Sequence, residues 1–164
     1  MMSPTPNRFA LVRGSSEGRT RLNAFDHALL NAGVGDTNLM RVSSILPPSS
    51  KRCDVREFDL PKGGLIPLAY ATIDGTTPGR LISAAVAVGI PEDPAEPGVI
   101  MEFEDHAGVE TVEGIVNQMV VDAFDYRERT LKEILSVGIE HKVEVCGAVF
   151  AAVVLWYDSQ MNRE

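Results

Sequence analysis

The segment Ala148–Trp156 contains only apolar residues, and it constrains the fold more than any other part of the chain. Side chains of a strand point alternately to its two faces, so an all-apolar strand needs cover on both faces. The longest apolar run, Gly147–Tyr157, is far shorter than the ~20 residues that a membrane-spanning helix needs. The segment therefore predicts a strand in the middle of a layered stack or at a subunit contact.

Hydrophobic spacing along the whole chain predicts two helices and about seven strands. Because these elements come in blocks rather than in strict strand–helix alternation, their order predicts an α+β fold, with each sheet covered by a helix on one face. The last two strands are predicted to pair around Gly147. The predicted helices are Thr20–Asn31 and Val109 to about Ser136, and the predicted strands are Phe9–Arg13, Asn38–Leu46, Leu65–Ile73, Arg80–Ile90, Val99–Glu104, Val137–Val145 and Ala148–Tyr157.

Length and charge narrow the classes of protein. The 164 residues predict a single domain, 1–164. With 15 Lys and Arg against 23 Asp and Glu, the net charge of −8 argues against a nucleic-acid partner, because such binding rests on cationic contacts. We expect no membrane association, since no signal-peptide core or spanning segment is visible. Cys53 and Cys146 lack metal-site spacing and fit a reducing compartment, so a cytoplasmic location is predicted.

Asp26 is the residue that helical periodicity singles out. At about 100° per residue it lies between Leu22 and Leu30 on the apolar stripe of the first predicted helix. A carboxylate in that position costs free energy unless it is paired. Either it reaches solvent at the edge of the stripe, or it binds a cation, for which a guanidinium is the best planar match.

Two further features carry little information by themselves. Ser43 and Ser44 lie near the end of a predicted strand, and serine pairs are usually inert. Glu102 shares a strand face with Ile100 and Glu104, which an exposed sheet face explains equally well. A catalytic acid at this position needs burial to raise its pKa toward the working pH.

Metal and nucleotide sites are not expected. The group Glu140, His141 and Glu144 is a weak metal candidate, and a solvated or hydrogen-bonded histidine is the stronger reading. The glycines Gly33 and Gly35 lack the third glycine of a dinucleotide fingerprint and follow a helix rather than a strand.

Several sequence blocks, read in order from about Leu11 to Tyr157, resemble the pyruvoyl-dependent arginine decarboxylases. The most specific of them is Arg41-Val-Ser-Ser-Ile-Leu-Pro-Pro48. The matching blocks are Gly14–Gly18, Leu22–Asp26, Ala28–Gly33, Asn38–Pro48, Ile82–Val86, Ile100–Glu104, Glu140-His141 and Phe150–Tyr157.

The resemblance implies a proenzyme that cuts itself between Ser43 and Ser44. The Ser44 hydroxyl would attack the Ser43 carbonyl, and elimination followed by hydrolysis would leave a pyruvoyl group at residue 44. The products would be a β chain, 1–43, and an α chain, 44–164. Such a cut requires a strained peptide held in place by its surroundings.

The implied reaction converts L-arginine to agmatine and carbon dioxide, for polyamine synthesis. The covalent pyruvoyl cofactor would form a Schiff base with the substrate and accept the electron pair left by carbon dioxide. The resemblance assigns proton return to Glu102, guanidinium binding to Asp26, and help with the cut to Asn38, through the oxyanion. Six residues of extended strand would place Asn38 ~20 Å from Ser44, so it would have to reach the bond through a bend, a neighbouring strand or another subunit.

The implied architecture is a layered αββα sandwich with largely antiparallel sheets, assembled as a trimer of αβ units with active sites at subunit contacts. Two alternatives stay open: a pyruvoyl decarboxylase of another amino acid such as histidine, and an unprocessed, non-catalytic oligomer partner. The joint presence of Ser44, Glu102, Asp26 and Asn38 argues against the second. The chain departs from the family in carrying Arg19 and Arg21 near a site for a cationic substrate.

Overall fold

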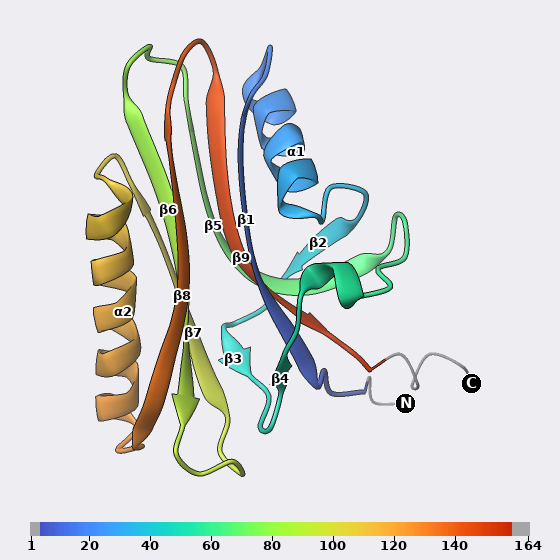
Figure 1. Ribbon diagram of the computed structural model, residues 1–164, viewed down its shortest axis with the longest axis vertical. Coiled ribbons are helices and arrows are strands. Elements are labelled where there is room, and N and C mark those ends of the chain that lie inside the picture. The colour runs from blue at the N-terminus through green and yellow to red at the C-terminus, as the bar shows by residue number, and fades with distance from the viewer. Residues whose placement is uncertain (1–3, 159–164) are drawn as a thin grey trace.

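A computed structural model describes residues 4–158, which form four layers in the order helix, sheet, sheet, helix (Figure 1). The α+β prediction and the αββα sandwich are confirmed. None of the described helices is long and apolar enough to cross a membrane. The elements are β1 (Arg8–Glu17), α1 (Arg21–Ala32), β2 (Asn38–Arg41), β3 (Ile45–Leu46), β4 (Lys51–Arg52), the 3₁₀ turn η1 (Val55–Glu57), β5 (Leu65–Gly75), β6 (Leu81–Pro91), β7 (Gly98–Asp105), α2 (Val109–Tyr126), β8 (Leu131–Lys142) and β9 (Gly147–Trp156).

The two sheets divide the strands unequally. One sheet has the strand order β2-β5-β9-β1-β4, and the other has the order β3-β7-β6-β8. All pairings are antiparallel except the short contacts of β1 with β4 and of β2 with β5. Helix α1 packs on the five-stranded sheet and α2 on the four-stranded sheet, so each helix covers one outer face (Figure 1).

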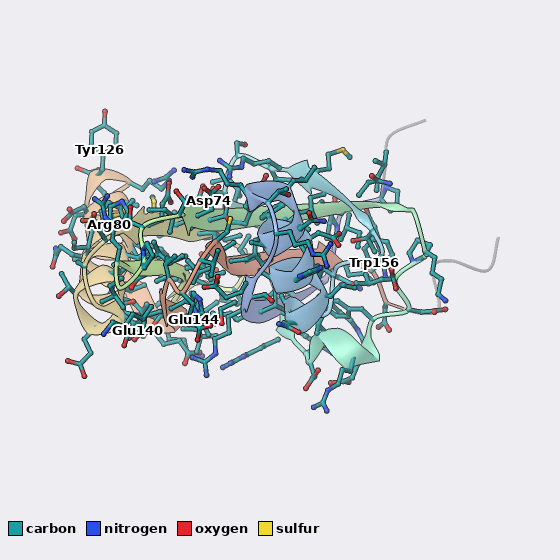
Figure 2. All side chains as sticks on the ribbon, turned by 90° about the horizontal axis from the view of Figure 1, so that it is seen from above. Asp74, Arg80, Tyr126, Glu140, Glu144 and Trp156 are labelled. Atoms are coloured by element: carbon teal, nitrogen blue, oxygen red, sulfur yellow. The ribbon has the colours of Figure 1, made fainter. Side chains whose placement is uncertain are left out.

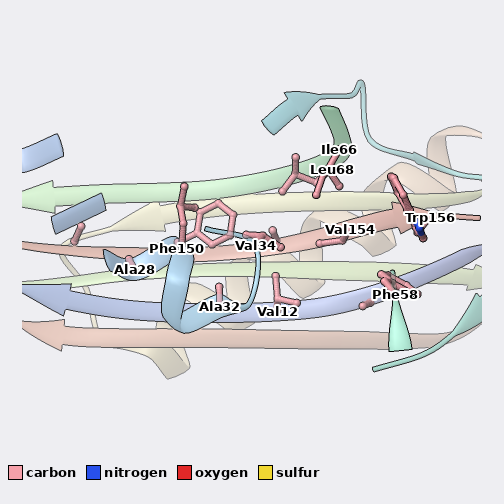
Figure 3. Packing of buried hydrophobic residues seen from close by; sticks show 14 of the residues in the cluster. Val12, Ala28, Ala32, Val34, Phe58, Ile66, Leu68, Phe150, Val154 and Trp156 are labelled. Carbon is pink, nitrogen blue, oxygen red and sulfur yellow. The ribbon is translucent and has the colours of Figure 1, made fainter. Parts of the chain in front are cut away.

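The all-apolar strand β9 lies at the centre of the five-stranded sheet, as its composition predicts. Phe150 and Val154 point into the core beneath α1 (Figure 3), while Val149 and Val153 point into the core between the two sheets. Every residue of β9 is buried. Because both faces of the strand meet apolar layers, no polar residue is tolerated along it.

Helix α1 buries three alanines and Leu29, and leaves its other two leucines exposed. Ala24, Ala28 and Ala32 pack on the sheet, whereas the side chains of Leu22 and Leu30 are 74% and 50% exposed. The predicted apolar stripe is therefore wrong for Leu22 and Leu30, whereas Leu29 and Phe25 do pack against the core. A Cβ on Gly14 of β1 would stand 2.1 Å from the carbonyl oxygen of Ala28, so the helix backbone approaches the strand too closely for larger side chains.

The second helix is shorter than predicted. It ends at Tyr126, which projects from α2 into solvent (Figure 2), instead of continuing to about Ser136. Glu128 has a φ of +53°, and the amide of Arg129 donates to the carbonyl of Phe124, so the chain turns sharply here. Leu131, which fits the helical spacing, begins β8 instead. Periodicity alone could not separate these residues from the helix.

The last two strands do not pair with each other, contrary to prediction. β8 pairs with β6 in the four-stranded sheet, whereas β9 lies between β5 and β1 in the other sheet. The chain therefore crosses from one sheet to the other over residues 143–146. β1 is also longer than predicted, since it continues past Arg13 and ends at Glu17.

The side chain of Glu17 stabilises this connection between the sheets, residues 143–146. Its carboxylate accepts hydrogen bonds from the amides of Glu144, Val145 and Cys146, at 2.9, 3.1 and 2.7 Å. Nε2 of His141 lies 2.6 Å from the same carboxylate. Burial acts to raise the pKa of Glu17, but these hydrogen bonds together lower it to about 2 from its ordinary 4.5. The ionised carboxylate thus ties the end of β1 to the β8–β9 connection.

We expect Glu17→Gln to lower the free energy of unfolding by about 2 kcal/mol at neutral pH, because hydrogen bonds to a charged acceptor are lost. Since the pKa of Glu17 is lower in the folded protein, its contribution is complete above pH 4.5 and disappears as the pH falls toward 2. Denaturant unfolding at several pH values should therefore show that the difference in unfolding free energy between wild type and variant decreases as the pH falls from 4.5 toward 2. Glu144→Gln is the matched control. A constant difference in unfolding free energy between wild type and Glu17→Gln at all pH values would contradict the prediction.

Candidate active site

The chain passes from one sheet to the other at the Ser43–Ser44 peptide. Asn38–Leu46 was predicted to be one strand, but the structure divides it into two. β2 pairs in parallel with β5 in the five-stranded sheet, and β3 pairs with β7 in the four-stranded sheet. The side chain of Leu46 is buried between the sheets. Its burial favours the passage of the chain from the five-stranded to the four-stranded sheet. Residues 42–44 form this crossing and belong to no strand.

Ser44 adopts a left-handed backbone conformation, with a φ of +69°. This region is disfavoured for a residue with a Cβ and stores strain where the surroundings enforce it. The carbonyl oxygen of Ser44 accepts a hydrogen bond of 2.8 Å from the amide of Ile100, and the β3–β7 pairing begins at the next residue. Backbone strain is thus found at Ser44, the second residue of the predicted cleavage site.

The Ser44 hydroxyl donates to the carboxylate of Glu102, with Oγ 3.1 Å from Oε2 and 3.4 Å from Oε1. Glu102 lies on β7, on the strand face that also bears Ile100, which is buried between the sheets. The two residues are 58 positions apart in the chain, and both are half-buried. The structure therefore brings Ser44, of the predicted cleavage site, and the predicted proton donor into direct contact.

Several neighbours act on the ionisation of Glu102. Burial raises its pKa above the ordinary value, as a catalytic acid requires. The hydrogen bond from Ser44 and the positive charge of Arg41 lower it, and the negative charge of Glu104 raises it. Burial outweighs the opposing effects, so the carboxyl holds its proton to a higher pH than an exposed glutamate does.

Arg41 is the residue that sequence reasoning missed at this site. It ends β2, three positions before Ser44, and its guanidinium carbon lies 4.1 Å from the ring centroid of Tyr70. Its Nη2 donates to the carbonyl oxygen of Tyr70 at 3.1 Å. Arg41 heads the most specific sequence block, but only the fold shows that its charge acts on Glu102.

Asn38 is not brought to the cleavage site. It lies at the other end of β2 from Arg41, and its side-chain amide donates to the carbonyl oxygen of Gly63 at 2.8 Å. Among the described residues, no hydrogen bond joins it to Ser43 or Ser44. The bend at residues 42–44 does not turn this side chain toward the scissile peptide, so its part in the cut stays a prediction.

Asp26 is also remote from Ser44 and Glu102 within one chain. It is exposed on α1, which packs on the outer face of the five-stranded sheet, whereas Glu102 faces the layer between the sheets. The nearby Arg21 is paired with Asp74 at the end of β5. A role for Asp26 at the Ser44 site therefore requires the α1 face of another subunit.

The weak metal candidate is not supported. The part of the chain that the structure describes contains no group of three or more metal-ligating side chains in binding geometry. Glu140 instead accepts a hydrogen bond from the amide of Val109 at 2.9 Å and so caps α2, whose N-cap residue Gly108 has no side chain to do so. His141 contacts Glu17.

The family described as pyruvoyl-dependent arginine decarboxylase (PvlArgDC) matches residues 8–160. The chain belongs to this family. A pyruvoyl-dependent arginine decarboxylase of Methanocaldococcus jannaschii is 47% identical over 152 residues, which cover 93% of this chain and 91% of that relative.

A second arginine decarboxylase relative, from Pyrococcus abyssi, is 39% identical over 153 residues, covering 93% of this chain and 96% of the relative. A solved structure of a pyruvoyl-dependent histidine decarboxylase matches with a TM-score of 0.49 and 14% identity, over 60% of this chain and 53% of that chain. Membership of the arginine decarboxylase family thus extends over almost the whole sequence, including both sheets and both helices.

The residues of the segment 42–44 fit the formation of a covalent pyruvoyl group, after which the family is named. A pyruvoyl group forms from a serine whose hydroxyl attacks the preceding carbonyl, and Ser44 combines a strained backbone with a hydroxyl held by a carboxylate. Its carbon atoms come from Ser44 itself, and its keto oxygen would come from water.

Proposed function

We propose that this protein is a self-processing pyruvoyl-dependent decarboxylase that converts L-arginine to agmatine and carbon dioxide, as a step of polyamine synthesis. The observation that carries the proposal is the contact between Ser44, in its left-handed conformation, and the half-buried carboxyl of Glu102. Membership of the arginine decarboxylase family supports arginine as the substrate.

Processing begins with attack of the Ser44 Oγ on the Ser43 carbonyl carbon. The Ser43–Ser44 C–N bond breaks, the hydroxyl proton passes to the released nitrogen, and an ester joins the two residues. In the elimination, a base removes the Cα proton of Ser44, the Cα–Cβ double bond forms, and the Cβ–Oγ bond breaks, which leaves a carboxylate on Ser43 and dehydroalanine at residue 44. Hydrolysis with loss of ammonia gives the pyruvoyl group, a β chain of residues 1–43 and an α chain of residues 44–164.

The surroundings of Ser44 favour these steps. Release of the left-handed strain at Ser44 contributes to the driving force for opening the peptide. The hydrogen bond from the amide of Ile100 and the β3–β7 pairing hold the residues that follow the cut. The new end of the α chain therefore stays beside Glu102.

When formed, the pyruvoyl carbonyl supplies an electron sink for decarboxylation. Glu102 then acts as the general acid, returning a proton to the substrate α-carbon from a carboxyl whose pKa burial has raised. Its present contact with Ser44 Oγ shows that the carboxyl reaches the atoms of residue 44.

The substrate guanidinium is bound by Asp26 of a neighbouring subunit in this proposal. We infer a trimer of αβ units, with active sites at subunit contacts, because Asp26 and Ser44 lie in different layers of one chain. The exposed Leu22 and Leu30 flank Asp26 on α1 and supply apolar area for a subunit contact.

Asn38 is proposed to assist the cut from a second subunit or after a local rearrangement. The free thiols Cys53 and Cys146 support a reducing, cytoplasmic location.

Asp26→Asn should raise the KM for arginine roughly tenfold or more, because a charge-assisted hydrogen bond to the guanidinium is lost. Cleavage should be unchanged, since Asp26 is proposed to contact the far end of the substrate and not the Ser43–Ser44 peptide. Steady-state kinetics on fully cleaved protein measure this, with Asp36→Asn, another exposed carboxylate just beyond α1, as the matched control. An unaltered KM would remove Asp26 from the binding role.

Mass spectrometry of the purified protein, followed by carbon dioxide release from a panel of amino acids, tests the proposal. We expect two fragments, with a blocked N-terminus on the longer one, and a preference for arginine. A preference for histidine would support the alternative substrate. An intact chain that never splits would overturn the proposal in favour of a non-catalytic partner.

A further inference from the structure

The chain around the predicted cut is held at two points, one in each sheet. On one side, the amide of Val42 donates to the carbonyl oxygen of Leu68 in β5 at 3.1 Å, and the Val42 side chain packs into the layer between the sheets. On the other side, Leu46 pairs with Gly98 of β7, and its side chain is buried in the same layer. Val42 and Leu46 thus anchor the chain on either side of Ser44, which lies between β2 and β3 (Figure 1).

Leu46 is the firmer of the two anchors. Its side chain is 3% exposed, whereas that of Val42 is half-buried. A Cβ on Gly98 would stand 3.1 Å from Cδ2 of Leu46, so the leucine occupies space that the glycine leaves free. Pro47 follows, and the residue before a proline is restricted to extended backbone. Both the side chain and the backbone of Leu46 are therefore fixed.

The two anchors cannot both be satisfied by an extended chain. Side chains four positions apart on an unbroken strand point in the same direction. Val42 and Leu46 are four positions apart, but they reach the layer between the sheets from opposite sides, because one is held by β5 and the other by β7. A residue between them must leave the extended conformation. Ser44 does so, with a φ of +69°, and its carbonyl oxygen accepts from the amide of Ile100 at 2.8 Å.

We propose that Leu46, together with Val42, is a positioning residue for self-cleavage, because burial of the two side chains imposes the left-handed conformation on Ser44. The proposal rests on the function proposed above, since this conformation matters to the reaction only if the chain cuts itself. Two buried apolar side chains stabilise the fold by more than one left-handed residue destabilises it, so the folded chain retains the strain. The Ser43–Ser44 bond lies between the anchors, and its opening releases that strain.

The first experiment measures the strain in protein that cannot be cut. Glycine adopts a positive φ without steric cost, whereas alanine is strained there. Ser44→Gly protein should therefore unfold at a higher denaturant concentration than Ser44→Ala protein, which is the reverse of the usual effect of glycine. Adding Leu46→Ala to both proteins should remove this difference or reverse it. A difference that persists without Leu46, or equal midpoints for Ser44→Gly and Ser44→Ala, would overturn the proposal.

The second experiment measures the rate of the cut, as the loss of the full-length chain after cell-free translation. Leu46→Ala should slow the cut about tenfold or more, the effect on a barrier of losing the strain of one left-handed residue. Leu46→Met, which has a similar volume, should restore most of the rate. Leu155→Ala is the matched control. It is the same substitution at another buried position of the same apolar cluster, but on β9, and it should leave the rate close to that of wild type.

A wild-type rate of cutting in Leu46→Ala protein would overturn the proposal. Equal slowing in Leu155→Ala protein would also overturn it, because the effect would then come from general destabilisation. If Leu46→Ala protein does not fold, Leu46→Val takes its place and should slow the cut by a smaller factor. If wild-type protein is never cut, the proposed function fails, whereas the midpoints of the Ser44→Gly and Ser44→Ala proteins still decide whether Leu46 imposes the conformation.

Discussion

Ser44→Ala is expected to abolish both the cut and the decarboxylase activity. The alanine side chain has no oxygen to attack the Ser43 carbonyl, so the ester cannot form and no pyruvoyl group is generated. Mass spectrometry should show one species of full length after prolonged incubation, and arginine should release no carbon dioxide above background. The expected loss of activity is complete, because the substitution removes the source of the cofactor rather than a single contact with the substrate.

Ser43→Ala is the matched control for this change. It removes a hydroxyl of the same size from the adjacent residue, which lies on the other side of the scissile bond, and the attacking Ser44 remains. This variant should still yield two chains. If Ser44→Ala protein still separated into fragments 1–43 and 44–164, the assignment of Ser44 as the attacking residue would be wrong.

Glu102→Gln should separate processing from catalysis. The side-chain amide oxygen still accepts the hydrogen bond from the Ser44 hydroxyl, so the orientation of the attacking oxygen is retained and the chain should still be cut. A neutral amide cannot deliver a proton as a carboxylic acid does. The rate of agmatine formation should therefore fall by about 10²- to 10⁴-fold, the usual contribution of a general acid.

Two measurements complete the test of Glu102. Borohydride with radiolabelled arginine should still attach substrate to the longer chain of Glu102→Gln protein, which shows that the loss lies after substrate capture. Glu104→Gln, two positions along β7, should change the rate far less, because its side chain does not contact Ser44. Normal turnover by cut Glu102→Gln protein would exclude Glu102 as the proton donor.

Much of the fold follows from local patterns. An all-apolar strand has one stable environment, between two apolar layers, and β9 occupies it with alternate residues facing α1 and the second sheet. The start of α1 at Thr20 and its end at Gly33, which has a φ of +87°, also follow from capping chemistry.

The errors arise where local patterns are ambiguous or where partners are remote. Leu131 and Ile134 fit either helical spacing or a strand. They lie in a strand because the helix ends before them, at a turn in which Glu128 has a left-handed backbone conformation. Leu22 and Leu30 imply an apolar stripe, but the close approach of Gly14 to α1 selects the alanine face for burial. Asn38 and Ser44 look like residues of one strand, because nothing in the sequence marks a change of sheet between them.

Residue patterns alone predict the layered class of fold and identify the serine pair, and the family resemblance singles out the carboxylates and the asparagine. Which of these residues meet depends on the folding of segments that are remote in the chain. Ser44 and Glu102 are in contact because Leu46 buries itself between the sheets and draws the strained peptide across to β7, while Asp26 stays on the far side of the other sheet. Side-chain identity is local, but distance and burial depend on how remote segments pack. The burial that raises the pKa of Glu102 therefore became visible only in the folded chain.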